Sequence, residues 1–157
     1  MTALPDTLLS LLGEQTRRLN TFSSLLEQET LALQQADIEA MSRLNPDKLQ
    51  HAEQLQWLAR ELRQLLAPLA GQDDVTLQRD WLHQQLSAHH PALLQQWEAA
   101  AQACRVQNER NGQMIEQQLR FNQQALHTLL PTPDPLYGID GRMGDDSNNA
   151  RRDYGKA

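Results

Sequence analysis

The feature that most constrains the fold is a regular series near the N-terminus, in which spacings of four and three residues alternate. Such spacing places every member on one face of an α-helix and makes a heptad seam, which is typically buried against another helix. We therefore predict a helix over residues 6–35, with Asp6 as its N-cap. The series consists of Leu8, Leu12, Gln15, Leu19, Phe22, Leu26, Glu29 and Leu33.

The same kind of periodicity predicts three further helices, over residues 37–71, 74–89 and 91–130. At a rise of ~1.5 Å per residue the last of them would be roughly 60 Å long. A helix of that length is stable only if other helices pack along it. Because the connections between the long helices are short, we expect neighbouring helices to run antiparallel.

Within the second helix, Asn45 and Pro46 interrupt the apolar pattern. Proline removes a backbone donor and clashes with the preceding turn, so the helix either kinks here or breaks and starts again with Asn45 as its cap. We favour a kink or a brief break, because the apolar pattern resumes at once. The face that we expect to be buried near this point includes Ile38, Met41, Leu44 and Leu49.

The composition agrees with a helical protein, since there are 28 Leu and 21 Gln but only two Val and three Ile. β-branched and aromatic residues, which favour strands, are too scarce to build a sheet. We therefore predict an all-α fold: an elongated antiparallel bundle of three long helices and one short connecting helix. Residues 1–130 would form this bundle domain. Residues 131–157, rich in proline and glycine, would form a flexible, irregular tail without material for a core.

Charge and chemistry exclude several classes of function. A net charge of −6 argues against nucleic-acid binding. The N-terminus lacks the features of a signal peptide and no segment approaches ~20 apolar residues, so we expect no membrane insertion and a cytoplasmic location. The histidines are isolated or adjacent, and no glycine-rich phosphate loop is present, so we expect neither an enzyme nor a metal or cofactor. The single cysteine, Cys104, lies on an apolar register and is predicted to be buried.

The last helix contains an anomaly, because Asn108 and Asn111 occupy positions of its apolar register and Gly112 lies in mid-helix. A mid-helix glycine costs about 1 kcal/mol relative to alanine, and a buried asparagine must have its hydrogen bonds satisfied. Three interpretations remain open: the asparagines fix the bundle register, the stretch is exposed to solvent, or it is a binding groove in which Gly112 lets another backbone approach.

Two apolar features follow this anomaly. The first is a stripe that we expect to pack in part on the other helices and in part to bind a partner helix. It consists of Ile115, Leu119, Leu126, Leu129 and Leu130. The second is a cluster over residues 136–141 of the tail, which either docks on another protein or folds back on the bundle.

These motifs together resemble the FlgN-type flagellar export chaperones. The resemblance covers about residues 5–141, and two segments of the chain carry it most specifically. They are Cys104-x3-Asn108-x2-Asn111-Gly112-x2-Ile115 and Leu136-Tyr137-Gly138-Ile139-Asp140-Gly141.

The resemblance implies a cytosolic chaperone that shields the C-terminal helical segments of the flagellar hook-associated proteins and delivers them to the flagellar export apparatus. Substrate binding maps to the later part of the last helix. Tyr137, with Gly138 and Ile139, matches the tail motif associated with docking to the export-gate membrane protein. The alternative hypothesis is a structural coiled-coil scaffold that homodimerises through the heptads of the first helix.

Overall fold

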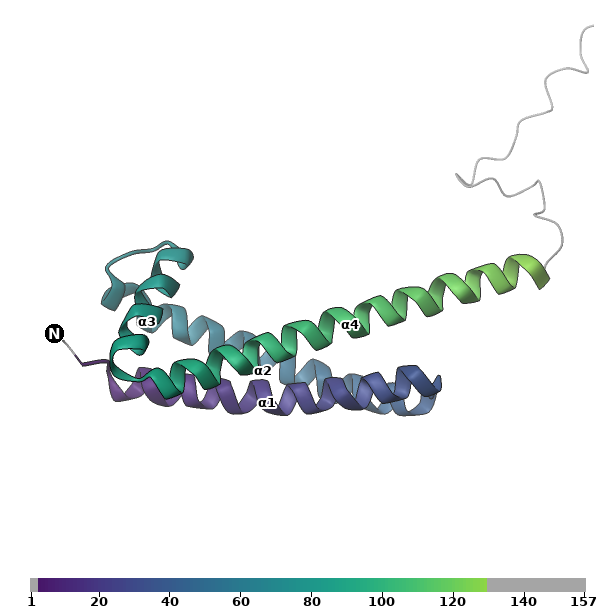
Figure 1. The fold of residues 1–157 in the computed structure, drawn as a ribbon, viewed down its shortest axis with the longest axis horizontal. Coiled ribbons are helices and arrows are strands. Elements are labelled where there is room, and N and C mark those ends of the chain that lie inside the picture. Colours follow the sequence, from purple (N-terminus) through teal and green to yellow (C-terminus); the bar gives the residue numbers. More distant parts are fainter. Residues whose placement is uncertain (1–2, 130–157) are drawn as a thin grey trace, which may run out of the picture. The chain divides into compact units, whose positions relative to one another are not determined.

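The computed structural model describes residues 3–129, which form four α-helices (Figure 1). In chain order they are α1 (Asp6–Gln35), α2 (Ile38–Ala70), α3 (Val75–His89) and α4 (Pro91–Leu129). The chain divides into two compact units after residue 117: the first contains the bundle, and the described part of the second is the end of α4. The predicted all-α antiparallel bundle is confirmed, whereas the predicted tail over residues 131–157 lies outside the described residues.

Local capping explains where the helices turn. The connection between α1 and α2 is only two residues long, because Ala36 adopts a left-handed conformation (φ 52°) and the N–H of Asp37 donates to the carbonyl of Ala32 at 2.9 Å. The Asp37 carboxylate then accepts from the N–H of Ala40 at 3.0 Å, as an N-cap does. Gly71 ends α2 at φ 65°, a conformation that favours glycine.

One prediction about a helix boundary is wrong, and one open alternative is decided. Asp6 is the first residue of α1 rather than its N-cap; Pro5 takes the cap position, and its carbonyl accepts from the N–H groups of Leu8 and Leu9. At Pro46 the structure excludes a break with a fresh start, because α2 is continuous there; it also contains a second proline, Pro68. Both prolines are exposed, so the carbonyls that lose their helical donors face water and no break is required.

The predicted buried face of the first half of α2 is only partly correct. Met41 and Leu44 are half-buried, but Ile38 is 77% and Leu49 63% exposed. The buried residues of this helix all lie in its second half, where the helix reaches the apolar core and α3. Sequence periodicity identifies the apolar face of a helix, but the neighbouring helices decide how much of that face is covered.

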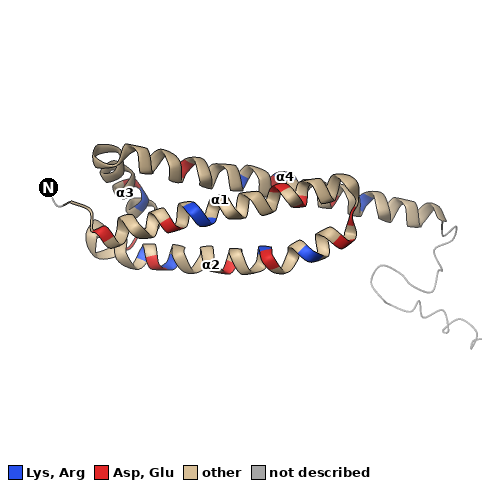
Figure 2. Ribbon diagram, turned by 90° about the horizontal axis from the view of Figure 1, so that it is seen from below, with Lys and Arg blue, Asp and Glu red and all other residues tan. Residues whose placement is uncertain are grey.

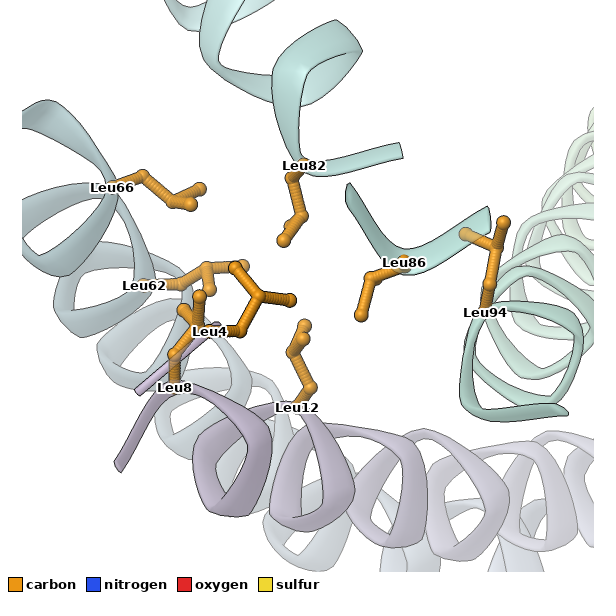
Figure 3. Packing of buried hydrophobic residues seen from close by; sticks show 8 residues of the cluster. All are labelled: Leu4, Leu8, Leu12, Leu62, Leu66, Leu82, Leu86 and Leu94. Carbon is orange, nitrogen blue, oxygen red and sulfur yellow. The ribbon is translucent and has the colours of Figure 1, made fainter. Parts of the chain in front are cut away.

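The apolar core is a cluster of leucines to which all four helices contribute, and their side chains point toward one another (Figure 3). α3 contributes Leu82 and Leu86 to this core, and both are fully buried. The cluster consists of Leu4, Leu8, Leu12, Leu62, Leu66, Leu82, Leu86 and Leu94. It joins the start of α1, the end of α2 and the start of α4 around α3.

We predict that Leu82→Ala lowers the free energy of unfolding by about 2–5 kcal/mol, because it leaves a cavity at a fully buried position. Leu77→Ala, on the same helix but 47% exposed, is the matched control and should cost much less. Urea unfolding followed by circular dichroism measures both values. Equal losses for the two variants would contradict the placement of α3 on the core.

Candidate functional site

The helix α4 changes character along its length. In the first unit its buried residues are Leu94, Ala100, Cys104 and Asn111. Farther along α4, the described members of the predicted apolar stripe are exposed: Ile115 by 43%, Leu119 by 57%, Leu126 by 56% and Leu129 by 75%. We call these four residues the α4 stripe. Leu130, the last residue predicted for it, lies outside the described residues.

Side-chain hydrogen bonds join the first part of α4 to α1, and their donors follow one another along α4 at intervals of seven residues. The Trp97 indole N–H donates to Gln15 Oε1 at 3.0 Å, and the Cys104 thiol donates to the Leu19 carbonyl at 2.9 Å. One heptad later, Asn111 bonds to the Leu26 carbonyl. Because the partners ascend together in both helices, α1 and α4 run in the same direction, as the first and last long helices of this bundle must.

Asn111 is the centre of a buried polar network. Its Nδ2 donates to the Leu26 carbonyl at 2.8 Å and to Glu29 Oε1 at 3.0 Å, while its Oδ1 lies 2.6 Å from the Thr30 hydroxyl. The two acceptors fix the orientation of the amide, because only its NH₂ group can donate to both. The second carboxylate oxygen of Glu29 accepts from Lys48 Nζ at 2.5 Å. The network therefore joins α1, α2 and α4.

This network decides among the interpretations of the asparagine–glycine segment. Asn111 is 1% exposed and bonded within the chain, so it fixes the register of the bundle and is not placed to contact a partner as the site prediction had it. Asn108 and Gly112 are exposed, and a Cβ added at Gly112 would meet nothing within 4 Å. No neighbouring side chain of the bundle requires glycine at position 112.

Sequence reasoning missed several residues of the site. Glu29 offered a signal, since it is a charged residue on an apolar seam, but Thr30 and Lys48 offered none. Phe121 was also missed, because it lies off the stripe, yet it is 71% exposed. The predicted burial of Cys104 is confirmed at 7% exposure, and this burial raises the pKa of its thiol.

The remaining chemistry of the described residues is sparse. Within residues 3–129, no three His, Cys, Asp or Glu side chains are grouped so that they could hold a metal ion. None of the four helices is long and apolar enough to cross a membrane. Figure 2 shows acidic and basic residues interspersed along α1 and α2, without a continuous basic stripe. Tyr137, Gly138 and Ile139 lie outside the described residues.

We predict that Asn111→Ala lowers the free energy of unfolding by about 2 kcal/mol or more, because it removes three hydrogen bonds to α1, one of which is a donor to the buried Glu29 carboxylate. Asn108→Ala is the matched control, exposed and three residues away, and should stay within about 0.5 kcal/mol of the unchanged chain. Chemical denaturation measures both. A neutral Asn111→Ala variant would refute the importance of the network.

Comparison with known proteins agrees with the resemblance seen in the motifs. The model of the FlgN protein family matches residues 1–144. The flagella synthesis protein FlgN of Escherichia coli (strain K12) is 29% identical over 144 aligned residues, which cover 86% of this chain and 88% of that protein. Its counterpart in Salmonella typhimurium is 30% identical over 136 aligned residues, covering 84% and 86%. No solved structure shows significant similarity to the chain. The chain therefore belongs to the FlgN family of flagella synthesis proteins.

Proposed function

We propose that this chain is a cytosolic export chaperone of flagellar assembly. It binds the C-terminal helical segments of hook-associated proteins, prevents their premature association and delivers them to the flagellar export gate. Membership of a family of flagella synthesis proteins supports the setting. The single observation that carries the binding role is the exposed α4 stripe.

The geometry of the stripe suits an amphipathic helix as partner. At ~100° per residue, the four members of the α4 stripe lie within an arc of roughly 80° on the helix surface. An exposed apolar strip of this kind is typical of helix-in-groove recognition. Asn108 and Gly112 are exposed beside the first stripe residue, Ile115, and extend the accessible surface toward the bundle.

The stripe alone is too small for tight binding. Burying what remains exposed of four such side chains contributes about 1 kcal/mol each, whereas a Kd of ~1 μM needs about 8 kcal/mol. Further contacts must therefore contribute, and Phe121 is the largest exposed apolar side chain on the described part of α4. A moderate affinity also favours release of the cargo at the export gate.

The alternative of a homodimeric coiled-coil scaffold finds little support in the contacts. The heptad seam of α1 was its motivation, but Leu8, Leu12, Leu26 and Leu33 are all buried within a single chain. These residues already pack inside the bundle and leave no seam for a second copy. A homodimer through the α4 stripe would still be detected by the mass of the purified chain in solution.

We predict that replacing both Leu119 and Leu126 by Asp weakens binding to a purified hook-associated protein at least tenfold, since each carboxylate would lose its hydration on the apolar partner. Because both leucines are exposed, the melting temperature should change by no more than about 2 °C. Gln117→Asp with Gln124→Asp adds the same charge on the opposite face of α4 and is the matched control. Isothermal titration calorimetry in which all three proteins bind equally well would exclude the α4 stripe as the cargo site.

Delivery to the export gate is a second part of the proposal, supported by the tail motif around Tyr137. We predict that Tyr137→Ala leaves the melting temperature and the calorimetric affinity for hook-associated proteins unchanged, but reduces their secretion from cells. Tyr154→Ala, which lacks the motif, should secrete normally. If Tyr137→Ala lowers the melting temperature by several degrees, the residue belongs to the core and its assignment to docking is wrong.

A further inference from the structure

A second surface feature is formed by residues between positions 59 and 97, which precede the α4 stripe in the sequence. It is a cleft of about 250 Å³ between α2 and α3, and its apolar walls include Leu62 and Leu66 of α2, Val75 and Leu82 of α3, and Trp97 of α4. A cavity of ~150 Å³ already accommodates benzene, so this α2–α3 cleft has room for one aromatic side chain. It shares no residue with the α4 stripe.

The charged residues that line the cleft indicate which kind of partner it would bind. The two charged residues that line it are both arginines, Arg63 of α2 and Arg79 of α3. Both are exposed, and no ion pair joins either of them to another residue of the part that the structure describes. The whole chain carries a net charge of −6. Two guanidinium groups without an ion pair to any described residue thus lie beside an apolar cleft, and carboxylates complement them.

The part of the cleft formed by α3 contains two features that are unfavourable in the free chain. Gln78 is 4% exposed, and its Nε2 donates to the Gln72 carbonyl at 2.7 Å, but its Oε1 is buried without a partner. Val75, an apolar residue of the same wall, is 56% exposed. Buried polar atoms without partners and exposed apolar residues are both unfavourable in a free protein, and they often gather at binding surfaces.

We propose that the α2–α3 cleft docks an acidic segment of a partner protein, distinct from the cargo helix on the α4 stripe. The segment inserts one large apolar side chain between α2 and α3 and sets carboxylates against Arg63 and Arg79. This site shares no residue with the α4 stripe.

The probe is a capped peptide, acetyl-Glu-Glu-Trp-Leu-Glu-Glu-amide, added to the ¹⁵N-labelled full chain and followed by NMR. We expect saturable shifts at the amides of residues 75–82 and at the Trp97 side chain, which weaken as salt is added. Replacing either Arg63 or Arg79 by Glu should raise the Kd at least fivefold without loss of helical circular dichroism, because both side chains are exposed. Arg60→Glu, an exposed arginine of α2 outside the cleft, is the matched control and should bind as the unchanged chain does.

Several results would overturn the proposal. One is the absence of saturable shifts at α3 and Trp97; another is equal weakening by Arg60→Glu and the cleft variants, which would indicate unspecific charge attraction. Equal binding of a peptide with Lys in place of every Glu would remove the charge complementarity. A dimer of the free chain that Arg63→Glu converts to a monomer, measured by light scattering, would assign the cleft to a second copy of this chain instead.

Discussion

A carboxylate buried between helices governs how this bundle is assembled. Glu29 is 4% exposed, and a charge in such a position is tolerated only when it is paired and hydrogen-bonded. Its two oxygens accept hydrogen bonds from Asn111 of α4 and Lys48 of α2. Both helices must therefore be aligned along α1 so that these donors lie beside Glu29. Sliding either helix along α1 would take away one of the two donors and leave one carboxylate oxygen buried without its partner. The polar network thus selects one packing among those that the apolar core allows.

The register of α4 links the core to the proposed cargo surface. Trp97, Cys104 and Asn111 bond to α1 at intervals of one heptad, which fixes the rotation of α4 about its own axis. The apolar residues farther along the helix, from Ile115 onward, are exposed. The apolar residues of α4 therefore form two groups: the first is covered by the chain itself, and the second is the surface that we propose for a helix of another protein.

The sequence predicts this structure best where the cause is local. Asp37, Gly71 and Pro91 mark helix boundaries correctly, since capping depends on a few adjacent residues. At Pro46 the sequence left a kink and a break open, because whether a proline breaks a helix depends on whether the freed carbonyl can face water; α2 is continuous there. The exposure of Ile38 was also missed, because burial depends on neighbours that only the assembled bundle supplies.

The same distinction applies to the sites. The pattern marked Asn111 as unusual but could not identify its partners, because Glu29 and Lys48 are distant in the chain and nothing in their local sequence indicates a pairing. The α4 stripe was predictable from periodicity, and only its exposure had to be observed. The α2–α3 cleft could not be predicted at all, since three helices must be in place before Arg63, Arg79 and Trp97 lie around one cavity.

Hydrogen–deuterium exchange of the full chain, alone and with the C-terminal helical segment of a hook-associated protein, tests most directly whether α4 is divided between core and cargo. In the free chain, amides of residues 94–111 should exchange slowly and those of residues 115–129 quickly. On binding, slow exchange should extend through residues 115–129 while the first stretch hardly changes. Slow exchange over residues 115–129 already in the free chain, or a bound state in which these amides still exchange quickly, would contradict the assignment of the α4 stripe to cargo.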